Sequence, residues 1–182
     1  MPNTKLLKEI EGYSTVLVIC DAQKMLDNTV EIIAALLENH DSGIFITVNQ
    51  PYNAIKKVLD KNNVDAKRLF FIDCITKMAV QKSEKSDDCL YISSPSALTE
   101  LGMSVTEALS AVKGKNKFVF IDSLGTFLIY NSSGSISKFS HFLITKMSIM
   151  GVDGIFMSVE KEMDQKLISD LQSFCQKTIR LK

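Results

Sequence analysis

Residues 117–122 read KFVFID, a lysine followed by four apolar residues and a carboxylate. A short run of aromatic and β-branched residues is typical of a strand that is buried on both faces of a sheet. The Lys113-Gly114-Lys115-Asn116 turn precedes the run and supplies the chain reversal that a strand start needs. The stretch therefore predicts a central strand.

Similar apolar runs alternate with longer segments whose apolar residues recur at helical spacing, which predicts an α/β fold. We expect three layers, a mainly parallel sheet with helices on both faces. Strands are expected at residues 15–20, 44–48, 68–72, 89–93, 117–122, 154–159 and 178–181. Helices are expected at residues 24–40, after Pro51, at 104–112, 137–150 and 164–175.

Two local patterns refine this expectation. Ser104-Val105-Thr106-Glu107 has the form of a capping box, in which a serine and a glutamate satisfy the free N–H groups at a helix start. We therefore expect the helix at 104–112 to begin there. Residues 77–88 are rich in charged residues and serine, which predicts a surface loop.

Length and charge narrow the class of protein. A chain of 182 residues that is 46% hydrophobic can bury one sizeable core, so we expect a single domain over residues 1–182. Its 21 lysines and arginines balance 21 aspartates and glutamates, so no net field attracts nucleic acid or an anionic membrane. The polar start of the chain and the lack of a long apolar run predict a cytoplasmic protein without a membrane span.

The four cysteines, Cys20, Cys74, Cys89 and Cys175, are widely spaced and form no CxxC pair. This spacing indicates neither a disulfide framework nor a zinc site, and we expect no bound metal. Three of the cysteines sit in or beside apolar runs, where we expect a reduced thiol to pack as a small hydrophobic group.

Polar residues follow the predicted strands, and in a parallel sheet ligands bind outside the carboxyl ends of the strands. The candidate ligand-binding residues of this crevice are Asp21, Lys24, Asn49, Gln50, Asp73, Asp122 and Ser123. An alternative is that such residues simply meet water and cap helices. No residue is nominated as catalytic, because the sequence lacks a GxSxG motif and its two histidines fall at a helix end and within a helix.

Residues 117–124, KFVFIDSL, resemble a Walker B strand of the RecA/KaiC/RadA superfamily of ATPases, particularly its archaeal branch of small uncharacterised members. Residues 43–51, GIFITVNQP, are similar to the second strand of KaiC-like proteins, and RLFFID at 68–73 and SPSALT at 94–99 continue the resemblance in order. The resemblance covers nearly the whole chain and implies a RecA-like fold of the P-loop NTPase type.

The chain departs from the superfamily at the Walker A motif. Between the first strand and helix, residues 20–29 read CDAQKMLDNT, without the glycines that let backbone N–H groups wrap phosphates. Asp21 and Asp27 would also repel a polyphosphate. Where KaiC-like enzymes place paired glutamates after the second strand, this chain has Asn49 and Gln50, which cannot take up a proton.

These departures predict a degenerate P-loop, so ATP and magnesium are disfavoured and no cofactor is expected. Asp122 is then expected to be a retained fold residue that caps the turn after it. The first hypothesis is a non-catalytic domain that binds a protein partner, either an ATPase of the same superfamily or a copy of itself. The alternative is a crevice that binds a nucleotide or another small ligand, with weak ATPase activity.

Overall fold

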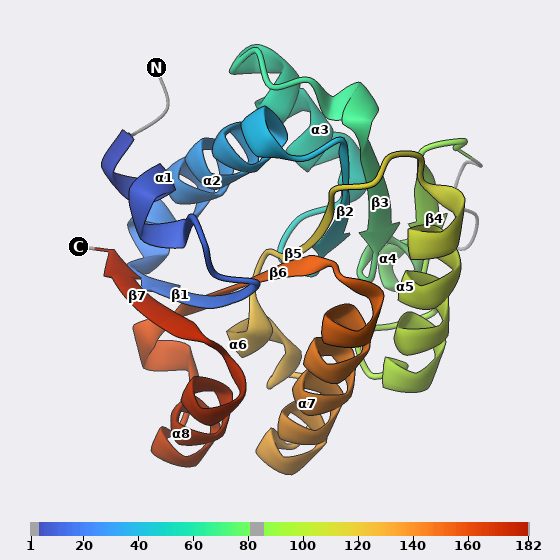
Figure 1. Cartoon of the computed structure of the whole chain (residues 1–182). Coiled ribbons are helices and arrows are strands. Elements are labelled where there is room, and N and C mark those ends of the chain that lie inside the picture. The colour runs from blue at the N-terminus through green and yellow to red at the C-terminus, as the bar shows by residue number, and fades with distance from the viewer. Residues whose placement is uncertain (1–3, 81–85, 182) are drawn as a thin grey trace.

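The computed structural model describes residues 4–80 and 86–181 (Figure 1). Within these two ranges, seven strands form one sheet in the order β4-β3-β2-β5-β6-β1-β7, and every pairing between them is parallel. The strands are β1 Thr15–Cys20, β2 Ser42–Thr47, β3 Leu69–Asp73, β4 Cys89–Tyr91, β5 Lys117–Ile121, β6 Asp153–Val159 and β7 Lys177–Leu181. The predicted α/β fold with a parallel sheet is confirmed.

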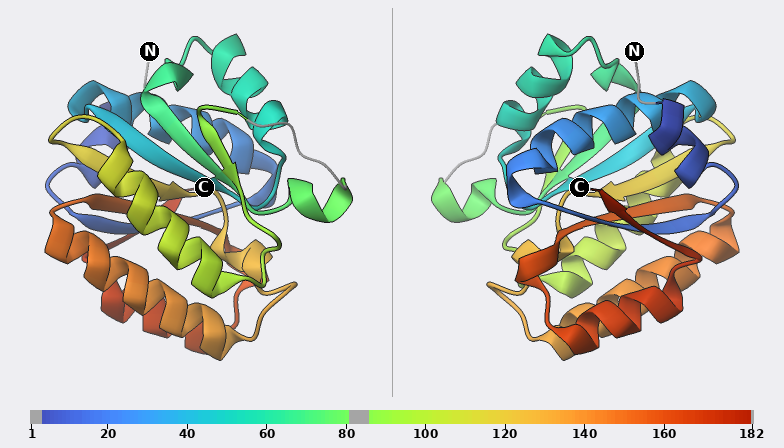
Figure 2. Two further views of the ribbon diagram at one scale, coloured as in Figure 1. Left: turned by 90° about the vertical axis from the view of Figure 1, so that its right-hand side faces the viewer. Right: turned by 90° about the vertical axis from the view of Figure 1, so that its left-hand side faces the viewer.

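Helices cover both faces of the sheet (Figures 1 and 2). They are α1 Thr4–Ile10, α2 Met25–Asn39, α3 Tyr52–Lys61, α4 Thr76–Ala79, α5 Leu98–Ala111, α6 Leu124–Phe127, α7 Ser133–Met150 and α8 Gln165–Phe174. Short 3-10 turns are η1 Ala22–Lys24, η2 Ala66–Arg68 and η3 Glu160–Glu162. Helices α1, α2 and α3 pack on one face, and α5, α6, α7 and α8 pack on the other.

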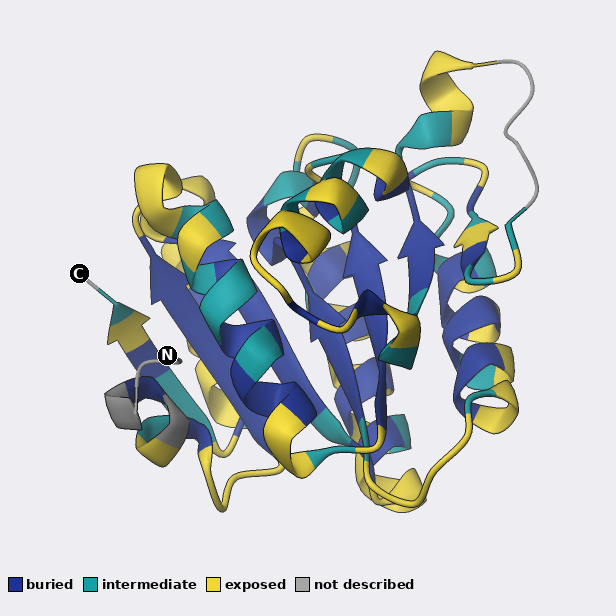
Figure 3. Cartoon of the chain, turned by 90° about the horizontal axis from the view of Figure 1, so that it is seen from above, coloured by how far each residue is buried: buried dark blue, intermediate teal, exposed yellow. Residues whose placement is uncertain are grey.

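Strand β5 occupies the middle of the sheet, as its sequence predicts. Phe118 and Phe120 point into the core under α2 and α3, whereas Val119 and Ile121 point into the core under α5 and α7. All four side chains are at most 1% exposed. Figure 3 shows the same burial along the neighbouring strands. A strand that contributes to two cores must be apolar on both sides, which explains the unbroken run.

The four cysteines are reduced and buried. Cys20 and Cys89 belong to the core under α2 and α3, and Cys74 and Cys175 belong to the other core. The packing role predicted for three of these thiols is confirmed, and the fourth is buried in the same way.

The predicted helix start at Ser104 is wrong. Helix α5 begins six residues earlier, at Leu98, and Ser104 lies buried within it. The turn at Ser94–Ala97 precedes the helix, and Glu100 in its first turn accepts hydrogen bonds from the Ser93 backbone N–H at 3.3 Å. Ser104 is therefore a small residue on the packed face of α5, and it does not cap the helix.

The other helices and loops lie closer to their expected ranges. Helix α7 begins at Ser133 rather than 137, because Ser132 accepts a hydrogen bond from the Ser135 N–H at 3.2 Å. The short helices α1 and α6 were not expected. Helix α4, residues 76–79, overlaps the start of the segment at 77–88 that was expected to be a loop, and Ser86 near its end pairs with Cys89 in an isolated bridge. Residues 81–85 lie outside the described part of the chain.

Candidate functional site

The carboxyl ends of the strands meet at one edge of the sheet, where the predicted crevice residues gather. Asp122 follows β5, and its backbone N–H donates to the Ile46 carbonyl of β2 at 3.1 Å. Asp73 ends β3, and the next residue, Cys74, donates its N–H to the Thr47 carbonyl of β2 at 3.0 Å. These two carboxylates therefore flank the end of the same strand.

The Asp122 carboxylate is held by the end of β2. One oxygen accepts from the backbone N–H of Val48 at 2.9 Å and of Asn49 at 3.4 Å, and the other lies 2.9 Å from Thr47 Oγ1. The side chain is 4% exposed, and burial raises its pKa to about 6. Asp122 therefore joins β5 to β2 through its side chain.

The expectation that Asp122 caps the turn after it needs correction. Ser123 performs that role, because its hydroxyl accepts the N–H of Thr126 at 3.3 Å and so starts α6. The Ser123 hydroxyl also lies 3.3 Å from a carboxylate oxygen of Glu162, in η3.

Asp73 is completely buried and accepts four hydrogen bonds from the protein. One oxygen accepts the N–H of Tyr52 at 2.7 Å and the hydroxyl of Thr76 at 2.5 Å. The other oxygen accepts the N–H groups of Ile75 at 2.9 Å and Thr76 at 2.8 Å. This carboxylate satisfies N–H groups at the starts of both α3 and α4, so its four acceptor positions are filled.

A cavity of about 280 Å³ lies between α2 and the ends of β2, β5 and β6. Three of the predicted crevice residues, Asn49, Gln50 and Asp122, line this cavity. Asp21, Lys24, Asp73 and Ser123 are not in its lining. Apolar side chains form most of the remaining wall, which consists of Ala22, Met25, Leu26, Thr29, Ile55, Val159 and Glu162.

Glu162 is a lining residue that the sequence prediction missed. It lies in η3, directly after β6, and thus at the same strand edge as the predicted residues. Gly125 of α6 lies against it, since a Cβ at that position would come within 2.5 Å of a Glu162 carboxylate oxygen. The position of Glu162 after a strand is the signal that could have identified it.

The connection between β1 and α2 is short. It consists of Asp21, which is extended, and η1, after which α2 starts at Met25. The Lys24 N–H donates to the Asp21 carbonyl at 3.0 Å, which closes the turn. Among the described residues, positive φ values occur only at Gly12, Asn63, Gly114 and Gly151, so none falls in this connection.

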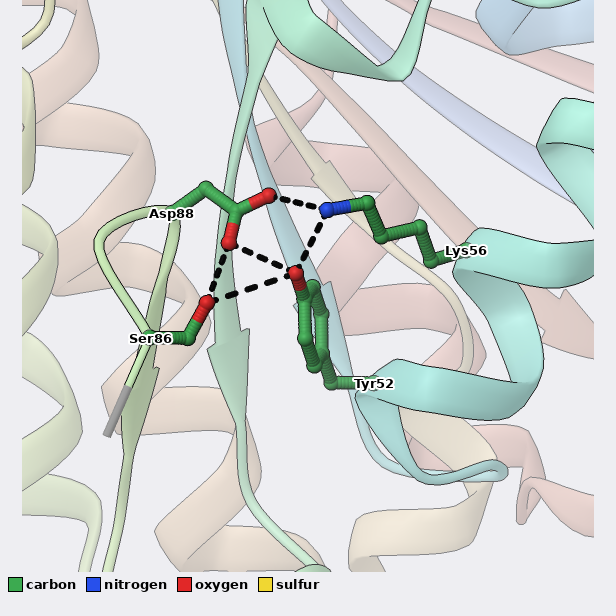
Figure 4. A network of polar contacts seen from close by, with 4 residues as sticks. All are labelled: Tyr52, Lys56, Ser86 and Asp88. Carbon is green, nitrogen blue, oxygen red and sulfur yellow. Dashed lines mark hydrogen bonds and ion pairs between the residues drawn. The ribbon is translucent and has the colours of Figure 1, made fainter. Parts of the chain in front are cut away.

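A polar network next to the crevice fixes α3 to the start of β4 (Figure 4). The hydroxyl of Tyr52 donates to Asp88 at 2.6 Å, and the Lys56 ammonium donates to Asp88 at 2.5 Å and to the Tyr52 hydroxyl at 2.8 Å. Ser86 also donates to Asp88. Partial burial opposes ionisation of Asp88, but the hydrogen bonds from Lys56, Ser86 and Tyr52 lower its pKa to about 2.

Replacing Lys56 with methionine is expected to lower the free energy of unfolding by about 1 kcal/mol at pH 7, because the Asp88 carboxylate loses its ammonium donor in a partly exposed site. Urea unfolding measures this change. The matched control is Lys57→Met, one residue along α3 and exposed, for which the change is expected to stay within about 0.5 kcal/mol. Equal losses for the two variants would contradict a role for the network.

An all-parallel, seven-stranded sheet covered by helices on both faces, with polar residues at the strand ends, defines an α/β protein with the fold of RecA-like and KaiC-like proteins. The chain belongs to the family of unknown function DUF7504, which it matches over residues 14–181. No curated protein matches the sequence.

Three similar solved structures are archaeal. An uncharacterized protein from Pyrococcus horikoshii, crystallised in complex with an unknown peptide, has a TM-score of 0.70 and 12% identity over 98% of this chain and 82% of that chain. A KaiC-like protein from the same organism has a TM-score of 0.64 and 13% identity over 93% of this chain and 73% of that chain. The flagellar accessory protein FlaH from Methanocaldococcus jannaschii has a TM-score of 0.61 and 13% identity over 99% of this chain and 77% of that chain. Because the sequence identities are this low, these similarities are evidence for a shared fold alone.

In the part of the chain that the structure describes, no helix combines the length and apolar character needed to cross a bilayer. No cluster of three or more histidine, cysteine or acidic side chains suited to a metal ion occurs among those residues either.

Proposed function

We propose that this protein is a non-catalytic RecA-like domain that acts in the cytoplasm by binding another protein. The observation that carries the proposal is the connection between β1 and α2. A phosphate-wrapping loop needs several backbone N–H groups arranged around an anion, and glycine usually provides the required φ angles. Here Asp21 and a single 3-10 turn take the place of such a loop, and the connection contains no glycine.

The two carboxylates of the crevice also support a non-catalytic role. Asp122 has the position of a Walker B aspartate in the resemblance, yet its oxygens lie within hydrogen-bond distance of three protein groups. Magnesium normally shares one or two carboxylates with phosphate oxygens and water. A carboxylate directed at the chain, beside a connection without a phosphate loop, does not fit a magnesium–ATP site, and Asn49 and Gln50 provide no base.

Two further facts agree with a protein partner. The similar uncharacterized protein from P. horikoshii was crystallised with a peptide, which demonstrates that one protein of this fold binds one. The formal net charge of the present chain is zero, so a partner recognised by bulk charge, such as nucleic acid, is disfavoured.

A second candidate function is the binding of a nucleotide or another small ligand in the crevice, with slow ATP turnover. The favouring observation is that Asn49, Gln50 and Asp122 line one cavity. Its volume of about 280 Å³ lies just below the range of about 300–1,000 Å³ that is usual for ligand pockets.

A thermal-shift panel of ATP, ADP, GTP and cyclic nucleotides, each with and without magnesium, separates the two functions. The proposed function predicts no shift, whereas a ligand at a hundred times its dissociation constant would add about 2.7 kcal/mol of stability. Titration calorimetry with magnesium–ATP checks the result. Magnesium-dependent binding of ATP that is lost in Lys24→Ala or Asp122→Asn would overturn the proposal, and a magnesium-independent shift would favour the second candidate.

A further inference from the structure

Helices α5 and α7 expose large apolar side chains on their outer surfaces. Met103 is 62% exposed, Phe142 48% and Ile149 81%. The exposed positions of three other helices differ, since all of them are polar: Asp27, Glu38 and Asn39 on α2, Asn53, Lys57, Asp60 and Lys61 on α3, and Gln165, Lys166, Ser169, Gln172 and Ser173 on α8. Clustered exposed apolar residues, unlike single ones, mark interaction surfaces.

The two helices lie side by side on the face of the molecule shown on the left of Figure 2. Two hollows of about 710 and 650 Å³ open on this surface, and both are lined by Phe142. Gly102 permits this arrangement, because a Cβ there would lie 3.1 Å from the Phe142 ring. The Phe142 ring therefore forms a ridge between two depressions. We call this surface, which includes Met103, Glu107, Lys138, Phe142, Lys146 and Ile149, the α5/α7 face.

The charges on the α5/α7 face are separated by helix. Glu107 lies on α5, whereas Lys138 and Lys146 lie on α7, and all three line the hollows. Among the described residues no ion pair within 4.0 Å joins Glu107 to either lysine. In a contact between two copies related by a two-fold axis, the α5 helix of each copy can meet the α7 helix of the other. The same residues would then provide two sets of opposite charges.

We infer that the α5/α7 face binds a second copy of this chain in a two-fold symmetric dimer. Phe142 of each copy enters a hollow of the other, and Glu107 of each copy pairs with Lys138 and Lys146 of the other. The inference rests on the proposed function, since it names the protein partner. A self-complementary surface explains why one face carries an aromatic ridge, matching hollows and both signs of charge.

The size of the face sets the expected affinity. Helices of 14 and 18 residues are about 21 and 27 Å long, and a helix pair is about 20 Å wide, so each copy offers roughly 500 Å². Two copies would bury about 1,000 Å², which lies below the roughly 1,200–2,000 Å² of stable interfaces and is typical of weak, transient ones. We therefore expect a dimer that dissociates in the micromolar range.

Sedimentation velocity from micromolar to submillimolar concentration tests the inference. The unaltered chain is expected to pass from monomer to dimer, and Phe142→Glu is expected to raise the dissociation constant at least about 30-fold. The matched control is Met78→Glu, because Met78 is also 48% exposed but lies on α4. This control is expected to dimerise like the unaltered chain.

Reversing the charges on α5 in one variant and on α7 in another tests the pairing of Glu107 with Lys138 and Lys146. Restored binding in a mixture of the two variants cannot result from a folding defect. Glu107→Lys alone and the double variant Lys138→Glu/Lys146→Glu alone are each expected to dimerise more weakly, because like charges then face each other. An equimolar mixture of the two variants is expected to form a heterodimer about as tight as the unaltered dimer. Lys57→Glu, on the opposite face of the molecule, is expected to change nothing.

Three outcomes would overturn the inference: a chain that stays monomeric throughout, a dimer that tolerates Phe142→Glu, or a variant mixture that stays monomeric. A monomer that binds a different protein would leave the proposed function intact. A different result would separate the two proposals the other way. If the protein forms the dimer with the expected charge dependence but also binds magnesium–ATP tightly, the proposed non-catalytic function is wrong and the dimer is retained.

Discussion

Replacing Asp122 with asparagine is expected to stabilise the protein by about 3 kcal/mol at pH 8 and to leave its stability nearly unchanged at pH 4. The expectation combines the burial of Asp122 with the geometry of its hydrogen bonds. A charged carboxylate in this position is deprived of water, whereas a carboxamide is neutral at every pH.

The hydrogen bonds around Asp122 suit a neutral group with one donor. Thr47 Oγ1 lies 2.5 Å from the Gln50 carbonyl and 2.9 Å from an Asp122 oxygen, but a hydroxyl has only one hydrogen to donate. If that hydrogen goes to Gln50, the Thr47 oxygen is available as an acceptor. A protonated carboxyl or an asparagine Nδ2 can donate to it, while Oδ1 keeps the N–H groups of Val48 and Asn49.

The sign of the pH dependence follows from linkage. The folded-state pKa of Asp122, about 6, lies above its ordinary value of 3.8, so the folded protein binds more protons than the unfolded chain between these values. The contribution of Asp122 to stability is therefore fully present below about pH 4 and is lost as pH rises through about 6. Asparagine does not titrate, so its advantage appears over this same interval.

Urea unfolding of the unaltered protein and of Asp122→Asn at pH 4, 6 and 8 measures the effect. Asp73→Asn is the matched control, since Asp73 is equally buried but has donors on both of its oxygens. An amide nitrogen there must face an N–H group, so this variant is expected to lose about 2 kcal/mol at pH 8, where Asp122→Asn is expected to gain stability. A pH-independent effect of Asp122→Asn would contradict the argument.

Replacing Gly43 with alanine is expected to destabilise the protein by about 2–3 kcal/mol. Gly43 lies in β2 beside Phe118 of β5, and a Cβ at position 43 would come within 2.2 Å of the Phe118 ring. Phe118 is completely buried, so its ring cannot turn outward into solvent to make room. The added methyl must therefore displace packed side chains or separate the two strands.

Thermal and urea unfolding measure this loss, and the double variant Gly43→Ala/Phe118→Leu tests its cause. The smaller leucine is expected to restore part of the stability lost by alanine, so the two substitutions should not be additive. Gly134→Ala is the control, because position 134 lies in α7 with nothing within 4 Å of a new Cβ. That variant is expected to keep its stability to within about 0.5 kcal/mol, because the position is exposed and lies in the first turn of the helix. A loss for Gly134→Ala as large as that for Gly43→Ala would point to a general glycine effect rather than to the ring.

Much of the fold could be predicted because it depends on local periodicity. The run at 118–121 is apolar on both sides, and the structure places it between two cores in the middle of the sheet. Boundaries were less predictable, since a capping pattern such as Ser104-Val105-Thr106-Glu107 occurs equally well inside a helix. Whether a serine caps depends on where the preceding chain turns, and the turn at residues 94–97 decided that.

The candidate site could also be predicted only in part. The edge of the sheet that carries the polar residues could be predicted from the residue pattern, because residues that follow parallel strands share one edge. The roles of Asp73 and Asp122 at this edge could not be predicted, because they depend on how the chain packs. Their hydrogen-bond donors include Tyr52, 21 residues from Asp73, and Val48, 74 residues from Asp122. Local patterns report burial and periodicity, but the partner of a buried charge depends on which distant segments the packed sheet brings together.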